Sequence, residues 1–485
     1  MKIIVSSDKN KFWTKVINEL SLSGIQIVHW IGENLCNDTF PNGCNFSAID
    51  DIYENINTRL NSYRLFDIDT ITTEEYYNYI KILDRDDNLG GFSFSKRDRV
   101  FKDLLSYWNS ILQASNPDAI IFSNVPHLAY DYPLYLVAKK MKIKTMMFNM
   151  TPYADWCYIT HQIKGDGLNS HLIKLSNNNV LKQEFKKTAI EPYNQFTYTL
   201  PEYMKEQINF DSKMSKRSEK FKSLYSNVKT KLTQNHKSIT RTDFFTYVGE
   251  NEFFSIVGNY YIRNNYHRRL KEQYIKNTST HDEINKIKRY IYVPLHYQPE
   301  ATTSPLGGYF SDQIYLIEHL RKIVPNDIAI IVKEHYSQFS SALKGYLGRD
   351  LNYWSRICSI KNVHLSPLDY NQKELIINSL AVATVTGTAG WEAIQYGKYC
   401  IAYGEAWYSA HPNTINYKDL DTNKLNDIID NVKDKNDNVK DKNDEFLDIF
   451  CKSLLKVNLH SEREENYDNS SYAVASSIVS FLSNK

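Results

Sequence analysis

The sequence lacks several features that would each indicate a class of protein. Its six cysteines, at positions 36, 44, 157, 358, 400 and 451, show no Cys-x-x-Cys spacing, so neither a disulfide framework nor a structural zinc site is expected. The net charge of +2 gives no argument for nucleic-acid binding. No stretch approaches the ~20 apolar residues that span a bilayer, and the apolar N-terminus is too short for a signal peptide. We therefore expect a cytoplasmic protein with reduced thiols.

The order of apolar runs and helical patterns indicates two α/β domains. The two patterns alternate from Lys2 to Asn149 and again from Arg289, as is typical of open parallel sheets. We predict an α/β, GT-B-like fold in which two Rossmann-like domains face a cleft, with a helical insert and C-terminal helices. The predicted segments are an N-terminal Rossmann-like acceptor domain at 1–155, a mostly helical connector at 156–285, a Rossmann-like nucleotide-sugar domain at 286–430, a duplicated charged loop at 431–444 and closing helices at 445–485.

Two charged segments lie outside this alternation. The stretch 213–241 is rich in lysine and arginine and has few acids, which suits either a solvated helical connector or a contact with anionic lipid or an anionic acceptor. The heptapeptide Asn-Val-Lys-Asp-Lys-Asn-Asp at 431–437 recurs at 438–444. A single tandem copy predicts a tolerated duplication in a surface loop and not a solenoid.

The motif Thr-Gly-Thr-Ala-Gly-Trp-Glu at 386–392 follows a buried strand and opens a helix. Small residues let the backbone approach a ligand, and free amides at a helix start bind anions. We predict that Thr386, Gly387, Thr388 and Gly390 hold a phosphate and that Glu392 accepts ribose hydroxyls. The motif is neither Gly-x-Gly-x-x-Gly nor a P-loop. The alternative is a tight strand–helix turn in which the helix dipole favours the carboxylate.

Val-Lys-Glu-His at 332–335 ends another predicted strand. Residues just past the carboxyl end of a parallel strand line the ligand crevice. We expect Lys333, Glu334 and His335 at the nucleotide, with the lysine supplying charge and the histidine a directional donor. The alternative is a surface Lys-Glu pair with a capping histidine.

Two further loops follow predicted strands and face the same cleft. Polar residues mixed with proline and glycine at 294–308 suggest a rigid loop that meets the sugar or acceptor, or else a long interdomain loop. Its candidates are His296, Gln298, Glu300 and Thr302.

In the first domain, His127 or Asp131 is a candidate base for the acceptor hydroxyl, although Asp131 also suits a helix N-cap before Pro133. The Asp-x-Asp pairs at 67–69 and 84–86 follow no convincing strand, so no metal site is predicted.

These motifs resemble those of bacterial capsule and surface polysaccharide biosynthesis proteins. Val332-Lys-Glu-His335 is similar to their Lys-Glu-His-Pro motif, with Tyr336 in place of proline. The stretch 386–394 with Gly397-Lys398 is similar to their Thr-Gly-Thr-x-Gly-x-Glu-Ala motif, with Tyr399 in place of proline. Tyr297-Gln-Pro-Glu, Gly307-Gly308 and Asp312-Gln313 also look typical. The resemblance is good over about 290–411 and suggestive over 118–150.

The resemblance implies a GT-B glycosyltransferase that uses CMP-activated acidic sugars of the Kdo or sialic-acid kind. It implies that His335 contacts the cytidine nucleotide and that Thr386 and Thr388 contact its phosphate. We therefore expect a metal-independent enzyme with no cofactor, whose partners are a nucleotide-sugar donor and a glycan or glycolipid acceptor, acting in the cytoplasm or at the cytoplasmic face of the membrane. Two alternatives remain: polyol-phosphate transfer from a CDP-linked donor, with His127 or His296 as base, and a capsule assembly or export factor without catalysis.

Overall fold

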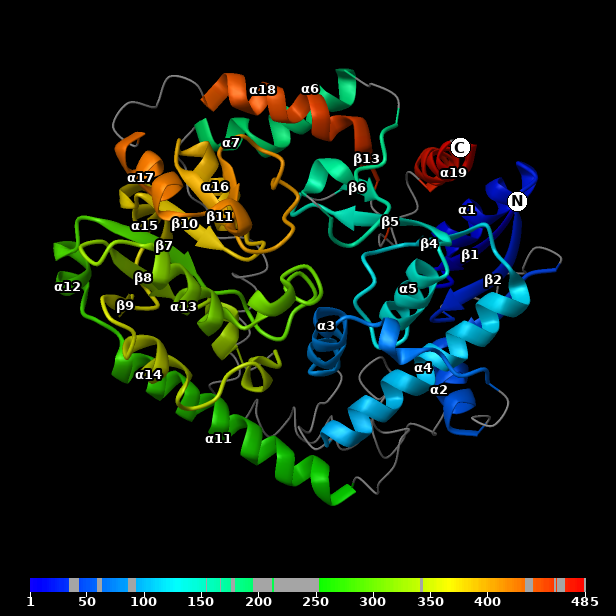
Figure 1. Cartoon of the computed structure of the whole chain (residues 1–485), viewed down its shortest axis with the longest axis horizontal. Coiled ribbons are helices and arrows are strands. Elements are labelled where there is room, and N and C mark those ends of the chain that lie inside the picture. The colour runs from blue at the N-terminus through cyan, green and yellow to red at the C-terminus, as the bar shows by residue number, and fades with distance from the viewer. Residues whose placement is uncertain are drawn as a thin grey trace.

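The computed structural model describes residues 1–34, 43–58, 63–85, 93–153, 155–165, 167–175, 179–194, 212, 253–340, 343–431, 439–457, 459 and 467–483. Two α/β halves lie side by side, the first blue to cyan and the second green to yellow (Figure 1). The predicted fold class, with two Rossmann-like domains, is confirmed. The basic stretch 213–241 lies outside the described residues.

The first half is built on a seven-stranded sheet of order β13-β6-β5-β4-β1-β2-β3. Its parallel strands are β1 (Lys2–Ser6), β2 (Gln26–Gly32), β3 (Asn45–Ala48), β4 (Ala119–Phe122) and β5 (Lys144–Met150). The antiparallel strands β6 (Trp156–Thr160) and β13 (Leu454–Lys456) extend one edge. Its helices are α1 (Lys11–Leu22), α2 (Ile49–Thr58), α3 (Thr73–Leu83), α4 (Phe94–Ser115) and α5 (Asp131–Lys140).

Local sequence explains why these elements form. β4 is a run of four buried apolar residues, as expected for a parallel strand covered on both faces. Asn10 caps α1, because its side chain accepts the Trp13 amide hydrogen. α3 begins with a capping box in which Thr72 and Glu75 each accept the other's backbone N–H.

The second half is built on a six-stranded parallel sheet of order β12-β11-β10-β7-β8-β9. Its strands are β7 (Tyr290–Pro294), β8 (Ala329–Lys333), β9 (Val363–Leu365), β10 (Ala381–Thr384), β11 (Tyr399–Ala402) and β12 (Thr414–Asn416). Its helices are α13 (Gln313–Ile323), α14 (Tyr353–Cys358), α15 (Gln372–Asn378), α16 (Thr388–Gln395) and α17 (Thr422–Asn431).

The remaining helices connect and close the two halves. α11 (Phe253–Asn277) and α12 (His281–Lys286) lead into the second sheet, and α11 runs along one side of the molecule (Figure 1). α6 (Asn179–Ala189) and α7 (Glu191–Asn194) lie near α18 (Val439–Phe450) on the opposite side (Figure 1). α19 (Tyr467–Ser483) packs on α1. Among the described residues, no helix is long and apolar enough to cross a membrane.

Three predicted boundaries need correction. The boundary at 155 cuts through the β5–β6 hairpin, so the first sheet continues into the segment taken as a helical connector. The closing segment 445–485 contains strand β13 between its helices, and this strand returns to the first sheet. In the second copy of the heptapeptide, residues 439–444 begin α18 and are not a loop.

A cluster of aromatic side chains joins the two halves, and helix α18 packs into this cluster. Phe446 and Phe450 of α18 pack with Trp156 of the first sheet, Phe185 of α6 and Trp391 of α16. Burial of such large rings supplies much of the stabilisation at an interface, because each removes 150–250 Å² from water. The two halves therefore meet at a well-packed aromatic contact, to which α6, α16 and α18 all contribute.

Candidate functional site

The strand order of the second sheet places the candidate site. The chain runs outward from β7 to β8 and β9 and then returns to the other side of β7 as β10. In open parallel sheets, ligands bind beyond the carboxyl ends of the strands where the order reverses. Here the reversal lies between β7 and β10, so the residues after these two strands, including His296 and Thr386, meet at one edge of the sheet.

His296 stands at the centre of this edge and is buried. Its Nδ1 lies 2.8 Å from Oε1 of Glu300, and its Nε2 lies 3.0 Å from the Thr384 hydroxyl. The Thr386 amide donates to the same Nε2 at 3.3 Å. Because Nε2 accepts an N–H, the proton of the neutral ring is on Nδ1 and is donated to Glu300. The result is a carboxylate–histidine pair aimed at the Thr-Gly-Thr turn.

Glu300 is held as a carboxylate by the groups around it. Burial acts to raise its pKa, but the hydrogen bonds from His296 and the Thr302 hydroxyl, and the positive charge that His296 and His335 carry when protonated, together keep the pKa below the ordinary value. The Thr302 hydroxyl donates to the same Oε1, and the Thr302 carbonyl accepts from the Thr386 hydroxyl. The loop after β7 is therefore bonded directly to the turn after β10.

The Thr-Gly-Thr turn presents the start of α16 at this edge. Gly387 is the N-cap residue, and its amide donates to the Thr384 hydroxyl. A Cβ on Gly387 would lie 2.9 Å from Thr384 Oγ1 and 3.2 Å from the His296 ring, so glycine permits the close approach of that ring. Thr388, the first residue of the helix, is exposed. The first amides of a helix have no intrahelical partner and attract anions.

His335 joins this group from the end of β8. Its Nδ1 accepts the Ser337 amide hydrogen at 3.2 Å, so the neutral ring carries its proton on Nε2. Burial lowers the pKa of His335, with the carboxylates of Glu300 and Glu334 opposing the shift, so the neutral form prevails at neutral pH. Within the part of the chain that the structure describes, no protein group bonds Nε2, which leaves it as a hydrogen-bond donor for a ligand.

The side chains of the other two residues in the Lys-Glu-His motif bond other groups of the protein. The Lys333 ammonium donates to the Tyr370 carbonyl, and burial lowers its pKa to about 8. Glu334 is buried and accepts four hydrogen bonds. Two come from Arg349, one from the Trp354 indole and one from the backbone amide of His335. These bonds occupy all four carboxylate lone pairs, so Glu334 has a structural role in fixing the loop that carries His335.

Three more predicted residues make mainly protein contacts. Gln298 exchanges hydrogen bonds with Gln338 and donates to the Thr303 hydroxyl. A Cβ on Gly390 would lie 2.2 Å from the Tyr408 hydroxyl, so this glycine allows α16 to pack closely. Glu392 accepts a hydrogen bond from Gln372 beside Tyr153 and Tyr193, and burial raises its pKa to about 7.

The predicted bases of the first half follow β4, next to the reversal between β1 and β4 in that sheet. Nδ1 of His127 contacts the Val125 carbonyl at 2.5 Å. Asp131 is buried at the first position of α5, and its Oδ1 accepts the Leu128 amide hydrogen at 2.6 Å. Asp131 therefore stabilises the turn before its helix. Both side chains therefore bond within the loop that follows β4.

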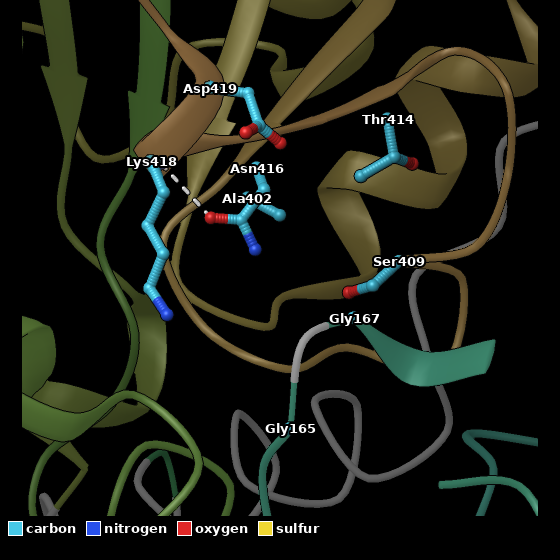
Figure 2. Close-up of a pocket in the computed structure, with 8 residues that line it drawn as sticks. All are labelled: Gly165, Gly167, Ala402, Ser409, Thr414, Asn416, Lys418 and Asp419. Atoms are coloured by element: carbon cyan, nitrogen blue, oxygen red, sulfur yellow. Dashed lines mark hydrogen bonds between the residues drawn. The ribbon is translucent and has the colours of Figure 1, made fainter. Parts of the chain in front are cut away.

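Sequence reasoning missed two residues and one cavity. Thr384 and Arg349 both hold His296, the first through its hydroxyl and the second through the backbone carbonyl. No spacing pattern marks either of them. A cavity of about 300 Å³ also opens between the halves, beyond the ends of β11 and β12 (Figure 2).

Among the described residues, no group of three or more His, Cys, Asp or Glu is placed to hold a metal ion.

Comparison with known proteins supports the resemblance found in the motifs. The family described as "Capsule polysaccharide biosynthesis protein" matches residues 189–425, which include the whole second sheet. No curated protein sequence matches the chain.

Several solved structures are similar over most of their length. A trehalose-6-phosphate structure from E. coli with UDP-2-fluoro glucose is 10% identical, with a TM-score of 0.29 and coverage of 100% of this chain and 99% of that chain. UDP-GlcNAc 2-epimerase from Methanocaldococcus jannaschii is 12% identical, with a TM-score of 0.21 and coverage of 99% and 100%. Thermosulfurimonas dismutans KpsC, a beta Kdo 2,7 transferase, is 9% identical, with a TM-score of 0.28 and coverage of 93% and 99%. At these TM-scores the likenesses carry no weight for mechanism.

Proposed function

We propose that this chain is a glycosyltransferase that moves a sugar from a nucleotide-activated donor to a surface polysaccharide or glycolipid, because residues 189–425 match the family described as "Capsule polysaccharide biosynthesis protein". The donor we favour is a CMP-linked acidic sugar. The second half binds the nucleotide, and the first half binds the acceptor. The reaction is metal-independent, and the nucleotide sugar is a substrate and not a cofactor.

One observation carries this proposal: the neutral His335 ring and the start of α16 converge on the edge where β7 and β10 separate. Nε2–H of His335 and the first amides of α16 are donors, and neither bears a full charge that must be desolvated. Such preorganised donors stabilise a phosphate best when negative charge develops on it. His296 and Glu300 hold the turn that presents these amides.

In the proposed step, the bond from the anomeric carbon to the donor phosphate oxygen breaks and its electron pair stays on that oxygen. The anomeric carbon bonds to the acceptor oxygen, and the hydroxyl proton passes to a base. Asp131 and His127 are the proposed bases because they follow β4 at the reversal of the first sheet. Thr386 and Thr388 add hydroxyl donors near the leaving phosphate.

A second candidate is transfer of a polyol phosphate from a CDP-linked donor. The observation that favours it is the carboxylate–histidine pair of Glu300 and His296, which resembles the arrangement of a general base. In that reaction His296 takes the proton of the attacking hydroxyl. The two candidates share the nucleotide site and differ in the group transferred.

The test is a nucleotide screen by thermal shift with CMP, CDP, UDP and GDP on the full chain. A ligand at ~100 times its Kd stabilises the folded state by about 2.7 kcal/mol. We expect a cytidine nucleotide to raise Tm and the other bases to do so less. The donor-site proposal fails if none of the four changes Tm. Product analysis with CMP-sugar and CDP-polyol donors then separates glycosyl transfer from polyol-phosphate transfer.

A further inference from the structure

Among the described residues that line the cavity between the two halves, none is proposed to bind the nucleotide. We propose that the cavity is a saccharide subsite that holds one sugar residue of the acceptor glycan, an inference that rests on the proposed glycosyltransferase function. Its volume is about 300 Å³, at the lower end of the ~300–1,000 Å³ found for small-molecule sites. That size suits a single sugar ring and not a whole nucleotide sugar.

The position of the cavity fits an acceptor that approaches the donor. Ala402 and Asn416, which pair as the last residues of β11 and β12, form part of one wall. This is the carboxyl edge that also carries His296, and β11 is the neighbour of β10. Gly165 and Gly167, which follow β6, close the cavity from the first half, as Figure 2 shows below the other side chains. An occupant would therefore touch both halves beside the Thr-Gly-Thr turn.

The first-half wall is fixed in place by the second half. The Gly165 amide donates a hydrogen bond to the buried carboxyl of Glu405, which follows β11. Glu405 in turn donates its backbone N–H to the Leu306 carbonyl of the loop after β7. Because Gly165 and Gly167 carry no side chains, backbone forms this wall; a Cβ on Gly167 would meet open space, whereas a Cβ on Gly165 would meet side chains of its own loop.

The polar groups around the cavity match the hydroxyls of a sugar. The Asn416 Oδ1 accepts the Lys418 amide hydrogen at 3.0 Å, so its NH₂ group is left to donate (Figure 2). Ser409 accepts the Ala406 amide hydrogen through Oγ and keeps its own hydroxyl proton for donation. Thr414 donates to the Tyr408 carbonyl and keeps lone pairs that accept. Both donors and acceptors thus line one small space.

Two charged side chains complete the rim on η8 (Tyr417–Asp419). Lys418 and Asp419 are both exposed, and in Figure 2 they lie across the cavity from Ser409. A carboxylate can accept two adjacent hydroxyls, and an ammonium can donate to a ring oxygen or to the carboxylate of a sugar acid. The lining residues are all small or polar, which favours a sugar over a nucleobase, since bases need apolar or aromatic faces.

The test measures binding of monosaccharides to the full chain by NMR titration at millimolar concentration. The probes are the methyl glycosides of glucose, N-acetylglucosamine and N-acetylneuraminic acid. Asn416→Asp keeps the acceptor that bonds the Lys418 amide and removes the NH₂ donors. Lys418→Met keeps the aliphatic stem and removes the ammonium. Lys361→Met is the matched control, because Lys361 is exposed before β9 at the opposite edge of the sheet.

We expect at least one glycoside to bind the wild-type chain, and each cavity variant to weaken that binding about five- to tenfold. The sugar acid should lose most on Lys418→Met if its carboxylate meets the ammonium. Lys361→Met should bind as the wild type does. No binding by any probe, or equal binding by all variants, would overturn the subsite.

A competition experiment separates this inference from the proposed function. Saturating CMP should leave the sugar affinity unchanged, because the acceptor subsite and the nucleotide site are distinct. Displacement of the sugar by CMP would overturn the acceptor assignment. If CMP does not bind at all while the sugar binds and the cavity variants weaken it, the nucleotide proposal fails and the saccharide subsite stands.

Discussion

Nδ1 of His296 lies 2.8 Å from Oε1 of Glu300, at the point where the strand order of the second sheet reverses. This contact fixes the tautomer of the ring, so Nε2 presents a lone pair to the Thr386 amide. The amide belongs to the turn that opens α16. The orientation of the proposed phosphate site therefore depends on the Glu300 carboxylate, which acts through His296.

Glu300→Gln tests this dependence. The amide oxygen can still accept from Nδ1, but the negative charge that favours one tautomer is lost. We expect turnover to fall about 10- to 100-fold, because small misplacements of reacting groups cost that much, while Tm changes little. The measurement is kcat with the donor identified by the nucleotide screen. The matched control is Glu445→Gln, because Glu445 is an exposed residue of α18. Equal turnover by the two variants would refute the role of Glu300.

His335 offers a sharper test because its two ring nitrogens have different tasks. In His335→Asn, the side-chain oxygen can still accept the Ser337 amide hydrogen, as Nδ1 does, but no donor stands at the position of Nε2. In His335→Gln, the longer side chain places an NH₂ donor near the position of Nε2. We expect the Gln variant to retain more nucleotide affinity than the Asn variant, which should lose about tenfold or more, since one hydrogen bond to a charged group contributes ~1.5–3 kcal/mol. Titration calorimetry gives both Kd values. The reverse ranking would show that the loop, and not Nε2, holds the nucleotide.

Two glycines of one motif should respond differently to alanine. In Gly390→Ala the new Cβ would lie 2.2 Å from the Tyr408 hydroxyl and 2.6 Å from Cys400 Sγ, so we expect a loss of stability of about 1–3 kcal/mol. In Gly387→Ala the nearest atoms are Thr384 Oγ1 and the His296 ring, so we expect weaker nucleotide binding with a smaller loss of stability. Urea unfolding and nucleotide titration of both variants check this. Equal effects on both measurements would contradict the assignment.

Most of the parallel strands in the two sheets could be predicted because they are short buried runs between helical patterns, whereas β3 and β12 could not. The site could be predicted only in outline. His296 and Thr386 are 90 residues apart, and their contact follows from the order of strands in the sheet, which the sequence pattern does not specify. Lys333 and Glu334 look as functional as His335 in the sequence, yet their side chains bond Tyr370 and Arg349. Which way each side chain turns depends on distant partners.

The missed strands have a related cause. β13 has three residues and pairs with β6, which lies almost 300 positions earlier in the chain. A run this short has no periodicity of its own, and only its antiparallel partner makes it a strand. Residues 439–444 of the second heptapeptide copy are helical for a similar reason. Asn443 bonds Gln395 of α16 and His411, and these contacts select a helix for a segment whose composition suits a loop.

Glu405 makes the stability of the chain depend on pH. Burial raises its pKa from 4.5 to about 7, with Lys164, the Gly165 amide and Lys418 opposing the shift. Because the pKa is higher in the folded state, the protonated carboxyl contributes stability that is fully present below pH 4.5 and is lost as the pH rises through 7. Glu405→Gln stays neutral and can still accept from Gly165. Relative to wild type, the variant should therefore gain stability between pH 4.5 and pH 8, on the order of 3 kcal/mol.

Urea unfolding of wild type and Glu405→Gln at pH 4.5 and pH 8 measures this difference. Glu445→Gln, on an exposed carboxylate, should show no such change with pH. If the free-energy difference between Glu405→Gln and wild type is the same at both pH values, the pKa of Glu405 is the same in the folded and the unfolded chain, and the proposed effect of burial is refuted.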